Sequence, residues 1–240
     1  MHLFYQVSII MHRILLLVGL VLLPVFGQLH YKQPKVETPV AKPSTASTLY
    51  DEMNLEGKVN NKAFELAVAG YEKIADRKRD VLTLIDFSKP STEERLFVFD
   101  MKKKQLLYSS VVSHGRNSGN NYATTFSNKN GSYKSSLGFY RTENTYNGKN
   151  GYSLVLEGLE KGVNDNARRR AIVMHGAAYA NPSVIRNGGR LGRSLGCPAL
   201  PQKMNRPIID AIKGGSILYI YAENQDYMAQ SSILNEKPMI

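Results

Sequence analysis

The stretch GRSLGCPAL, residues 192–200, contains Cys197, the only cysteine in the chain. Thiolates attack carbonyl carbons, so a catalytic cysteine needs a partner that accepts its proton. His175 ends the apolar run AIVMHGA (171–177) and precedes Gly176, which would let its ring face a cleft. Taken alone, the cysteine is more typical of an inert, buried residue, and the histidine is equally compatible with a place in the core. Together, the two stretches indicate a cysteine-dependent enzyme.

The residues around Cys197 favour a tight turn next to a binding pocket. Gly196 allows the backbone to turn closely before the thiol, and the N–H groups of Gly196 and Cys197 are then expected to be free to stabilise an oxyanion. Pro198 fixes φ just after the thiol. The preceding segment, 178–195, is rich in glycine and offers guanidinium groups for binding a carboxylate, from Arg186, Arg190 and Arg193.

The N-terminal residues follow the pattern of a secretory signal. Arg13 precedes an apolar run over 14–26, and the small residues Val25 and Gly27 precede a cleavage site. The run is shorter than the roughly 20 residues that span a membrane, although 3–11 is also apolar, which leaves an uncleaved anchor as the alternative. We predict a signal peptide over 1–27, and a mature protein in the periplasm or cell wall without membrane attachment.

The chain is basic, with a formal net charge of +11. Such an exported protein is attracted to anionic wall polymers and head groups. Lysines 102–104 and arginines 168–170 are its only runs of three identical basic residues, and neither has interleaved aromatic residues. We therefore interpret both as solvated turns and expect no nucleic-acid partner.

The pattern along the mature chain predicts one mainly β domain with flanking helices. A flexible Pro/Lys/Thr linker is expected over 28–48 and a helical segment over 49–80, including a helix over 62–76 whose apolar residues recur at three- and four-residue steps. A catalytic domain over 81–222 follows, and a polar tail over 223–240 is expected to fray. Strands are predicted over 81–88, 95–100, 105–112, 152–158, 170–176 and 216–221.

Two further features complete the predicted catalytic domain. Residues 113–151 are rich in Gly, Ser and Asn, and a polar loop of this length in a compact domain is usually functional. A helix is predicted over 203–213, with Pro207 in its first turn and Gly214-Gly215 at its end.

The pair HGAAY (175–179) and GRSLGCPAL (192–200) resembles the catalytic signature of the L,D-transpeptidases, the YkuD/ErfK-like murein enzymes. The resemblance extends over about 80–222. It implies a β-sandwich-like catalytic domain in which Cys197 is the nucleophile, His175 its base and the Gly176 carbonyl the group that orients the imidazole. It further implies that Ser194 and Gly196 shape the turn and the oxyanion hole, that peptidoglycan stem peptides are the substrate, and that no metal or organic cofactor is needed.

Substrate contacts are the least determined part of this interpretation. Many family members have a histidine at the position of Leu195, and an arginine or asparagine at that of Ala199. We therefore expect Arg190 or Arg193 to bind substrate instead, with Tyr179 as a further candidate contact. His114 opens the polar loop and either lines the cleft or lies on the surface. We expect a monomer.

Two alternatives stay open. The first is a zinc peptidase with His114, His175 and Cys197 as ligands, although the chain has no HExxH motif. The second is a wall-binding module that has lost catalysis and keeps an unreactive, buried cysteine. Thiol labelling at neutral pH is expected to separate an enzyme from such a module, because an accessible thiolate of lowered pKa reacts quickly.

Overall fold

The structure is a computed structural model that describes residues 45–235. The predicted signal peptide over 1–27 lies outside the described residues, as do most of the predicted linker and residues 236–240. No helix within 45–235 is long and apolar enough to cross a membrane.

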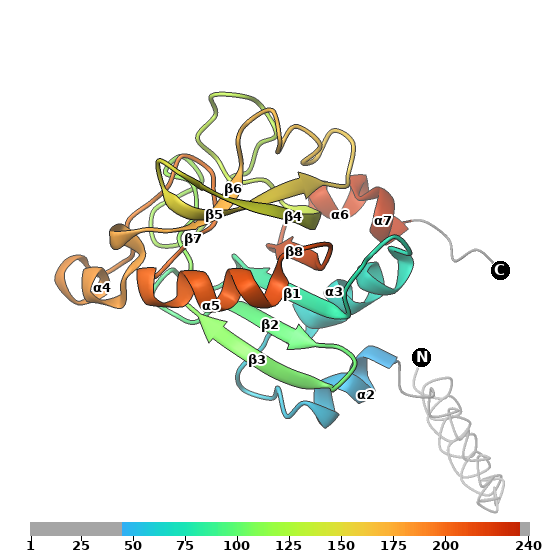
Figure 1. Cartoon of the computed structure of the whole chain (residues 1–240). Coiled ribbons are helices and arrows are strands. Elements are labelled where there is room, and N and C mark those ends of the chain that lie inside the picture. The colour runs from blue at the N-terminus through green and yellow to red at the C-terminus, as the bar shows by residue number, and fades with distance from the viewer. Residues whose placement is uncertain (1–44, 236–240) are drawn as a thin grey trace, which may run out of the picture. The chain divides into compact units, whose positions relative to one another are not determined.

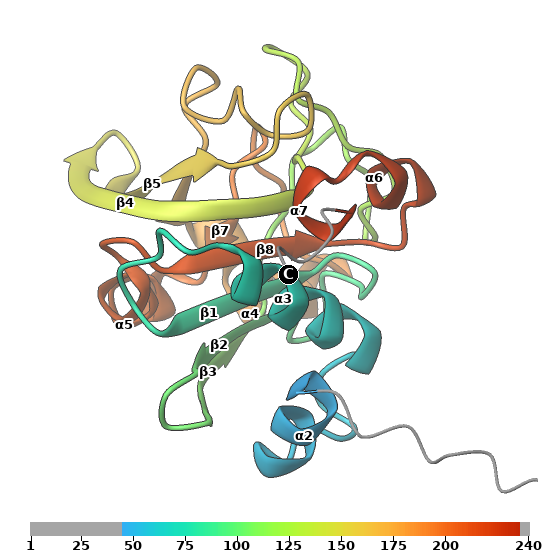
Figure 2. The same ribbon diagram turned by 90° about the vertical axis from the view of Figure 1, so that its right-hand side faces the viewer.

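An eight-stranded sheet with the order β3-β2-β1-β8-β4-β5-β6-β7 forms the framework. The β1–β8 and β6–β7 pairs are parallel, and the other neighbours are antiparallel. In Figure 2, β4 and β5 lie above β8, and β1, β2 and β3 lie below it. The strands are β1 (Val81–Asp86), β2 (Leu96–Asp100), β3 (Gln105–Ser110), β4 (Gly138–Gly148), β5 (Gly151–Gly158), β6 (Val173–Gly176), β7 (Ala199–Leu200) and β8 (Ile217–Tyr221).

Helices cover the central strands. Every residue of β1 and of β8 is buried, so both faces of these two strands are covered. Helix α3 (Asn61–Lys73) packs against β1 and β8, and α5 (Gln202–Ile212) against β1, β5 and β6 (Figure 1). A Cβ at Gly70 of α3 would lie 2.0 Å from the Phe139 ring, so only glycine lets this helix approach the sheet so closely.

The predicted fold class is confirmed: the domain is mainly β, has helices at its start and has α5 after Cys197. Helix α2 (Thr45–Glu52) precedes α3, whose first turn is capped by the Asn60 side chain accepting from the Ala63 N–H at 3.2 Å. β2 and β3 form the predicted hairpin, which turns at the lysines. Pro207 lies inside α5 rather than in its first turn.

The prediction of an uninterrupted loop over 113–151 is wrong, because β4 begins at Gly138. The first residues of β4, including Phe139 and Tyr140, are buried, whereas its second half is mostly exposed and polar. That half is part of the long β4–β5 hairpin and pairs with β5 out to Gly151. Its strand conformation therefore comes from backbone pairing and not from an apolar pattern that the sequence would display.

The prediction that the chain frays beyond Glu223 is wrong for residues 225–235. Helices α6 (Gln225–Gln230) and α7 (Ser232–Asn235) form there. The buried carboxylate of Glu160 accepts hydrogen bonds from the hydroxyls of Tyr227, at 3.2 Å, and Ser231. A buried carboxylate is stable only when hydrogen-bond donors surround it. The hydrogen bonds from Tyr227 and Ser231 to Glu160 therefore hold the polar tail against the domain.

Candidate active site

Two neighbouring segments hold the stretch that carries Cys197. On one side, Ser113 exchanges backbone hydrogen bonds with Ala199 at 2.8 and 3.3 Å, and the Ser194 N–H donates to the His114 carbonyl at 2.9 Å. On the other side, β7 pairs with β6, which places Ala199 beside His175. This double pairing brings the cysteine and the histidine, 22 residues apart in sequence, to the same end of the sheet.

A cavity of about 410 Å³ lies at this end. Five of the side chains predicted for the site line it: Cys197, His175, Ser194, Arg193 and Tyr179. The other lining residues are Asn150, Arg170, Ala171 and Leu195. A volume in the usual range for ligand pockets, together with a nucleophile and an imidazole, makes this cavity the candidate active site.

The His175 ring is held by the backbone that follows it. Its Nδ1 lies 3.1 Å from the Gly176 carbonyl oxygen, a contact in which Nδ1–H donates when the proton is on that nitrogen. In that tautomer Nε2 carries the free lone pair and can accept a proton. A Cβ at Gly176 would lie 3.0 Å from atoms of Asn205 in α5, so a larger residue would crowd the helix that supports this strand end.

The Cys197 sulfur rests against β6 and the residue that leads into it. The Val173 N–H donates to Sγ at 3.5 Å, and Sγ lies 3.7 Å from the Ala171 carbonyl oxygen. In the described part of the chain the His175 ring is not among the hydrogen-bond partners of Sγ. Catalytic hydrogen bonds are often long before substrate binds, so we expect the contact between the imidazole and Sγ to form in the complex with substrate.

The environment favours the uncharged forms of both groups. Burial raises the pKa of the Cys197 thiol, and the Val173 N–H and the Arg170 charge offset this only in part. Burial lowers the pKa of His175, against the opposing effect of the Gly176 carbonyl. Both shifts run against the lowered thiol pKa expected from the sequence, and both favour the uncharged forms of the thiol and the imidazole.

The turn before the thiol differs from the expected oxyanion hole in one respect. The Ser194 hydroxyl accepts from the Gly196 N–H at 3.0 Å and donates to the Cys197 carbonyl at 2.6 Å. The Gly196 donor is thus already used, which corrects the prediction that it is free. Within residues 45–235, the Cys197 N–H has no partner outside its own residue and is the donor available to an oxyanion.

Gly196 has no room for a side chain. Its φ is +129°, a conformation that residues with a Cβ rarely adopt. A Cβ there would lie 3.0 Å from the Lys134 carbonyl oxygen, 3.1 Å from Ile172 and 3.3 Å from Arg170. The loop ending near 136 and the segment before β6 therefore close around the nucleophile turn from two sides.

Arg170 is the main residue of the site that sequence reasoning misses. The basic run 168–170 is predicted to be solvated, and Arg168 and Arg169 are exposed, but Arg170 is half-buried. Its guanidinium donates to the carbonyl oxygens of Ser127, at 2.9 Å, and Lys134, and it lines the cavity close enough to stabilise the thiolate form of Cys197. Its place just before the buried strand is the only sequence signal that distinguishes it.

Ser135 connects the polar loop to the nucleophile turn. Its buried hydroxyl accepts from the Gly115 N–H at 3.0 Å and donates to the Gly196 carbonyl at 3.2 Å. The Ser135 N–H in turn donates to the Ser118 hydroxyl at 2.9 Å. Both serines belong to the 113–151 region, whose predicted role is functional. The hydroxyl of Ser135 thus holds the Gly196–Cys197 peptide group, which carries the free Cys197 N–H.

We expect Ser135→Ala to lower kcat about 10-fold or more, with a smaller change in KM. The Gly196 carbonyl loses its donor, and the peptide unit that orients the Cys197 N–H becomes free to rotate. Steady-state kinetics with a stem tetrapeptide measure the effect. Ser135→Thr keeps the hydroxyl and is expected to recover part of kcat. An equal loss in both variants would contradict the role of the hydroxyl and indicate a steric effect.

The remaining predicted residues differ in position. His114 is buried, its Nδ1 lies 2.8 Å from the Arg95 guanidinium, and burial and that charge lower its pKa to about 4. It lies neither on the surface nor in the cavity lining.

The two arginines predicted to bind substrate differ in position. Arg190 does not line the cavity, and it donates to the Leu191 carbonyl at 2.7 Å. Arg193 lines the cavity and donates to the Gly119 carbonyl at 2.9 Å.

Three predicted positions remain: Tyr179, and Leu195 and Ala199, which differ from the family pattern. Tyr179 lines the cavity, where burial raises its pKa to about 12, so the phenol is neutral. Leu195 is 59% exposed and also lines the cavity, while Ala199 is buried in β7. The segment that carries Tyr179 forms the short helix η1 (Ala178–Ala180) and then α4 (Pro182–Gly188), neither of which the sequence predicts.

The geometry gives the zinc alternative no ligand set. Among residues 45–235, no group of three His, Cys, Asp or Glu side chains is placed to hold a metal ion. His114 in particular faces Arg95 instead of the cavity that holds Cys197 and His175.

Comparisons with known proteins give a family match. A family model described as L,D-transpeptidase catalytic domain matches residues 55–221. Similar solved structures include an L,D-transpeptidase from Mycobacterium smegmatis (13% identity, TM-score 0.37, 60% of this chain and 59% of that one). Another is the helical cell shape determining protein Pgp2 from Campylobacter jejuni (15% identity, TM-score 0.43, 68% and 55%). The chain thus covers less than two thirds of the length of either structure. No curated protein matches the sequence.

Proposed function

Because the chain belongs to the L,D-transpeptidase catalytic domain family, we propose that it is an exported cysteine L,D-transpeptidase that acts on peptidoglycan stem peptides. The observation that carries the proposal is the cavity in which Cys197 and His175 lie together, beside an unpaired backbone N–H. We further propose that the predicted signal peptide directs the protein to the periplasm or cell wall, where it acts as a monomer without a cofactor.

The reaction is acyl transfer through a thioester. Cys197 Sγ attacks the carbonyl carbon between the L-centre of a diamino acid and the terminal D-alanine of a stem tetrapeptide. His175 takes the thiol proton and delivers it to the departing amine, so that the C–N bond breaks as the S–C bond forms. The Cys197 N–H stabilises the intermediate oxyanion. An amine of a second stem then resolves the thioester to a 3→3 cross-link, whereas water gives carboxypeptidase activity.

The charges in the cavity fit this substrate class. Arg170 and Arg193 line it, and its described lining contains no carboxylate. Stem peptides carry carboxylates on several residues, and guanidinium groups bind carboxylates well. The donors of Arg170 are largely used by the 127–136 loop, so Arg193 is the guanidinium more available to substrate.

Purified protein and a stem tetrapeptide provide the test of this function. We expect release of D-alanine and, by mass spectrometry, tripeptide together with 3→3 dimers. Absence of all three products from a folded protein would favour the wall-binding alternative. Thiol labelling at neutral pH separates the two alternatives less sharply, because burial raises the pKa of the Cys197 thiol.

The pH dependence of the activity follows from the shifted pKa values of His175 and Cys197. His175 must be neutral to accept the proton, and its pKa lies below the usual 6.5. Activity is therefore expected to fall only when the pH drops below 6.5, and to stay level up to the raised pKa of the Cys197 thiol, above its usual 9.0. The pH profile of kcat/KM for the tetrapeptide measures this. An acid limb centred above pH 6.5 would contradict the neutral resting pair.

A further inference from the structure

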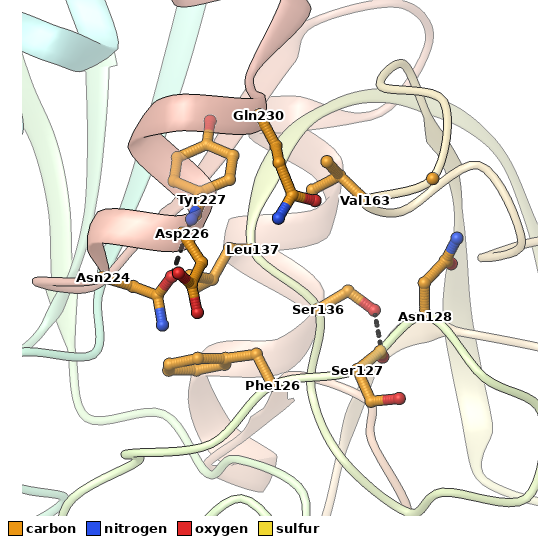
Figure 3. A pocket seen from close by; sticks show the side chains of 11 residues that line it. Phe126, Ser127, Asn128, Ser136, Leu137, Val163, Asn224, Asp226, Tyr227 and Gln230 are labelled. Atoms are coloured by element: carbon orange, nitrogen blue, oxygen red, sulfur yellow. Dashed lines mark hydrogen bonds between the residues drawn. The ribbon is translucent and has the colours of Figure 1, made fainter.

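A second cavity, of about 240 Å³, lies between the 126–137 segment and α6 (Figure 3). Residues of that segment line one wall, and α6 lines the opposite wall. Arg170 connects the two cavities: it lines the catalytic one and donates to the Ser127 carbonyl and the Ser136 hydroxyl, which both belong to residues that line the second. A ligand held here would lie next to the catalytic cavity.

The second cavity combines an aromatic ring with unused polar groups. Phe126 lines this cavity, and its ring lies nearly parallel to that of Phe87, with ring centroids 6.4 Å apart and planes 11° apart. In Figure 3, Asp226 and Gln230 of α6 lie above this ring. Within residues 45–235 neither side chain has a hydrogen-bond partner. Asn224 uses only its oxygen, which accepts from the Tyr227 N–H at 2.7 Å.

The walls of this cavity are fixed before any ligand binds. Glu160 anchors α6 and the residue that follows it, through Tyr227 and Ser231, and it also accepts from the Phe139 N–H at 2.7 Å. On the facing side, the Asn128 side chain donates to Asp165 at 2.7 Å. Preformed walls lower the entropy lost on binding, which allows even a small group with few contacts to bind.

We propose that this cavity binds an uncharged sugar ring of the glycan strand that carries the stem peptide. An aromatic face suits the C–H face of a pyranose, because the ring quadrupole attracts partly positive hydrogens. Asp226 accepts hydrogen bonds, the Asn224 amide donates them and the Gln230 amide does both, which matches hydroxyl and acetamide groups. The inference rests on the proposed function only for the source of the sugar.

Other ligand classes fit less well. The cavity is smaller than the roughly 300–1,000 Å³ of pockets for larger ligands, so it suits one ring and not a peptide. Its described lining contains Asp226 but no lysine or arginine, which disfavours a carboxylate or phosphate. The same residues include no second acidic, histidine or cysteine side chain that would hold a metal ion with Asp226.

The test uses a linear tetramer of N-acetylglucosamine, which is uncharged and carries no peptide. Binding to the full chain with Cys197→Ala is measured by ligand-observed NMR and calorimetry, so that turnover plays no part. We expect saturable binding, weakened about three- to tenfold by Gln230→Ala, the change that the loss of one hydrogen bond produces. Phe126→Leu, which keeps apolar volume but removes the ring face, is expected to weaken binding at least as much.

Gln225→Ala is the matched control, because Gln225 lies on the same helix, is exposed and does not line the cavity. It is expected to leave the Kd unchanged. No binding at millimolar tetramer, or binding that Gln230→Ala leaves unaltered, would overturn the proposal. Gln230 is exposed, so its substitution does not threaten folding.

A kinetic comparison separates this proposal from the proposed function. We expect active protein to prefer a glycan-linked tetrapeptide over the free one by KM, and Gln230→Ala to reduce that preference by the same three- to tenfold. Turnover of free tetrapeptide without tetramer binding would refute the sugar site alone. Tetramer binding without turnover of either peptide would refute the transpeptidase and leave the sugar site standing.

Discussion

Cys197→Ala is expected to abolish turnover of stem peptides while the domain stays folded. The sulfur is the only thiol of the chain and lines the cavity beside His175, so no other side chain can form the thioester. Within the described residues 45–235, its hydrogen-bonded contacts are limited to the Val173 N–H and the Ala171 carbonyl, and their loss costs little stability. The measurement is mass spectrometry of digested wall from a host that expresses either form.

Cys197→Ser is the matched variant for this experiment. The hydroxyl keeps the shape of the thiol but ionises far less readily, so we expect the same loss of 3→3 products. Thermal unfolding of both variants should lie close to that of the wild type. Unchanged 3→3 products with Cys197→Ala would reject Cys197 as the nucleophile.

His175→Asn is expected to lower kcat by about 10²–10⁴-fold, the usual contribution of a positioned general base. The asparagine amide can still donate to the Gly176 carbonyl, as Nδ1 does, but it provides no group in place of Nε2. Because burial raises the pKa of the Cys197 thiol, the variant without the imidazole depends on spontaneous ionisation to supply thiolate. KM should change little, because the cavity walls remain.

The pH profile distinguishes a lost base from a damaged site. In His175→Asn, thioester formation is expected to rise with pH towards the raised pKa of the Cys197 thiol, whereas the wild type stays level over the same range. Rapid-quench measurements of bound acyl group against pH give this comparison. A loss below tenfold, or two parallel profiles, would show that His175 is not the base.

The sequence predicts those parts of the molecule whose role depends on residue type and local pattern. A single cysteine in a glycine turn and a histidine at a strand end can be recognised directly in the sequence, and the two residues do line one cavity. The buried strands over 81–86 and 217–221 are equally visible, because every residue is covered and the runs are short and apolar.

Features that depend on long-range pairing are not visible in the sequence. The second half of β4 is polar, and only its pairing with β5 makes it a strand. The tail after Glu223 is also polar, and α6 is held by Glu160, a carboxylate more than 60 residues away in the sequence. The sequence does not distinguish Arg170 from Arg168 and Arg169. Only the hydrogen bonds that Arg170 donates to the 127–136 loop do so.

The details of the oxyanion hole also depend on the folded state. That Gly196 allows the turn can be expected from its residue type, but which of its hydrogen-bonding groups remain free cannot. The Ser194 hydroxyl takes the Gly196 N–H and Ser135 donates to its carbonyl, so the remaining donor is the N–H of Cys197. Which backbone groups stay free therefore depends on the side-chain rotamers in the packed loop.

The most direct test of the central claim is the mass of the protein during turnover. A stem tetrapeptide is mixed with the wild type, the reaction is quenched in acid within milliseconds to seconds, and the intact chain and its peptides are analysed by mass spectrometry. The account predicts an added mass equal to the tetrapeptide less D-alanine, located on the peptide that contains Cys197 and absent from Cys197→Ala. Tetrapeptide consumption without that adduct, or an adduct on another residue, would contradict it.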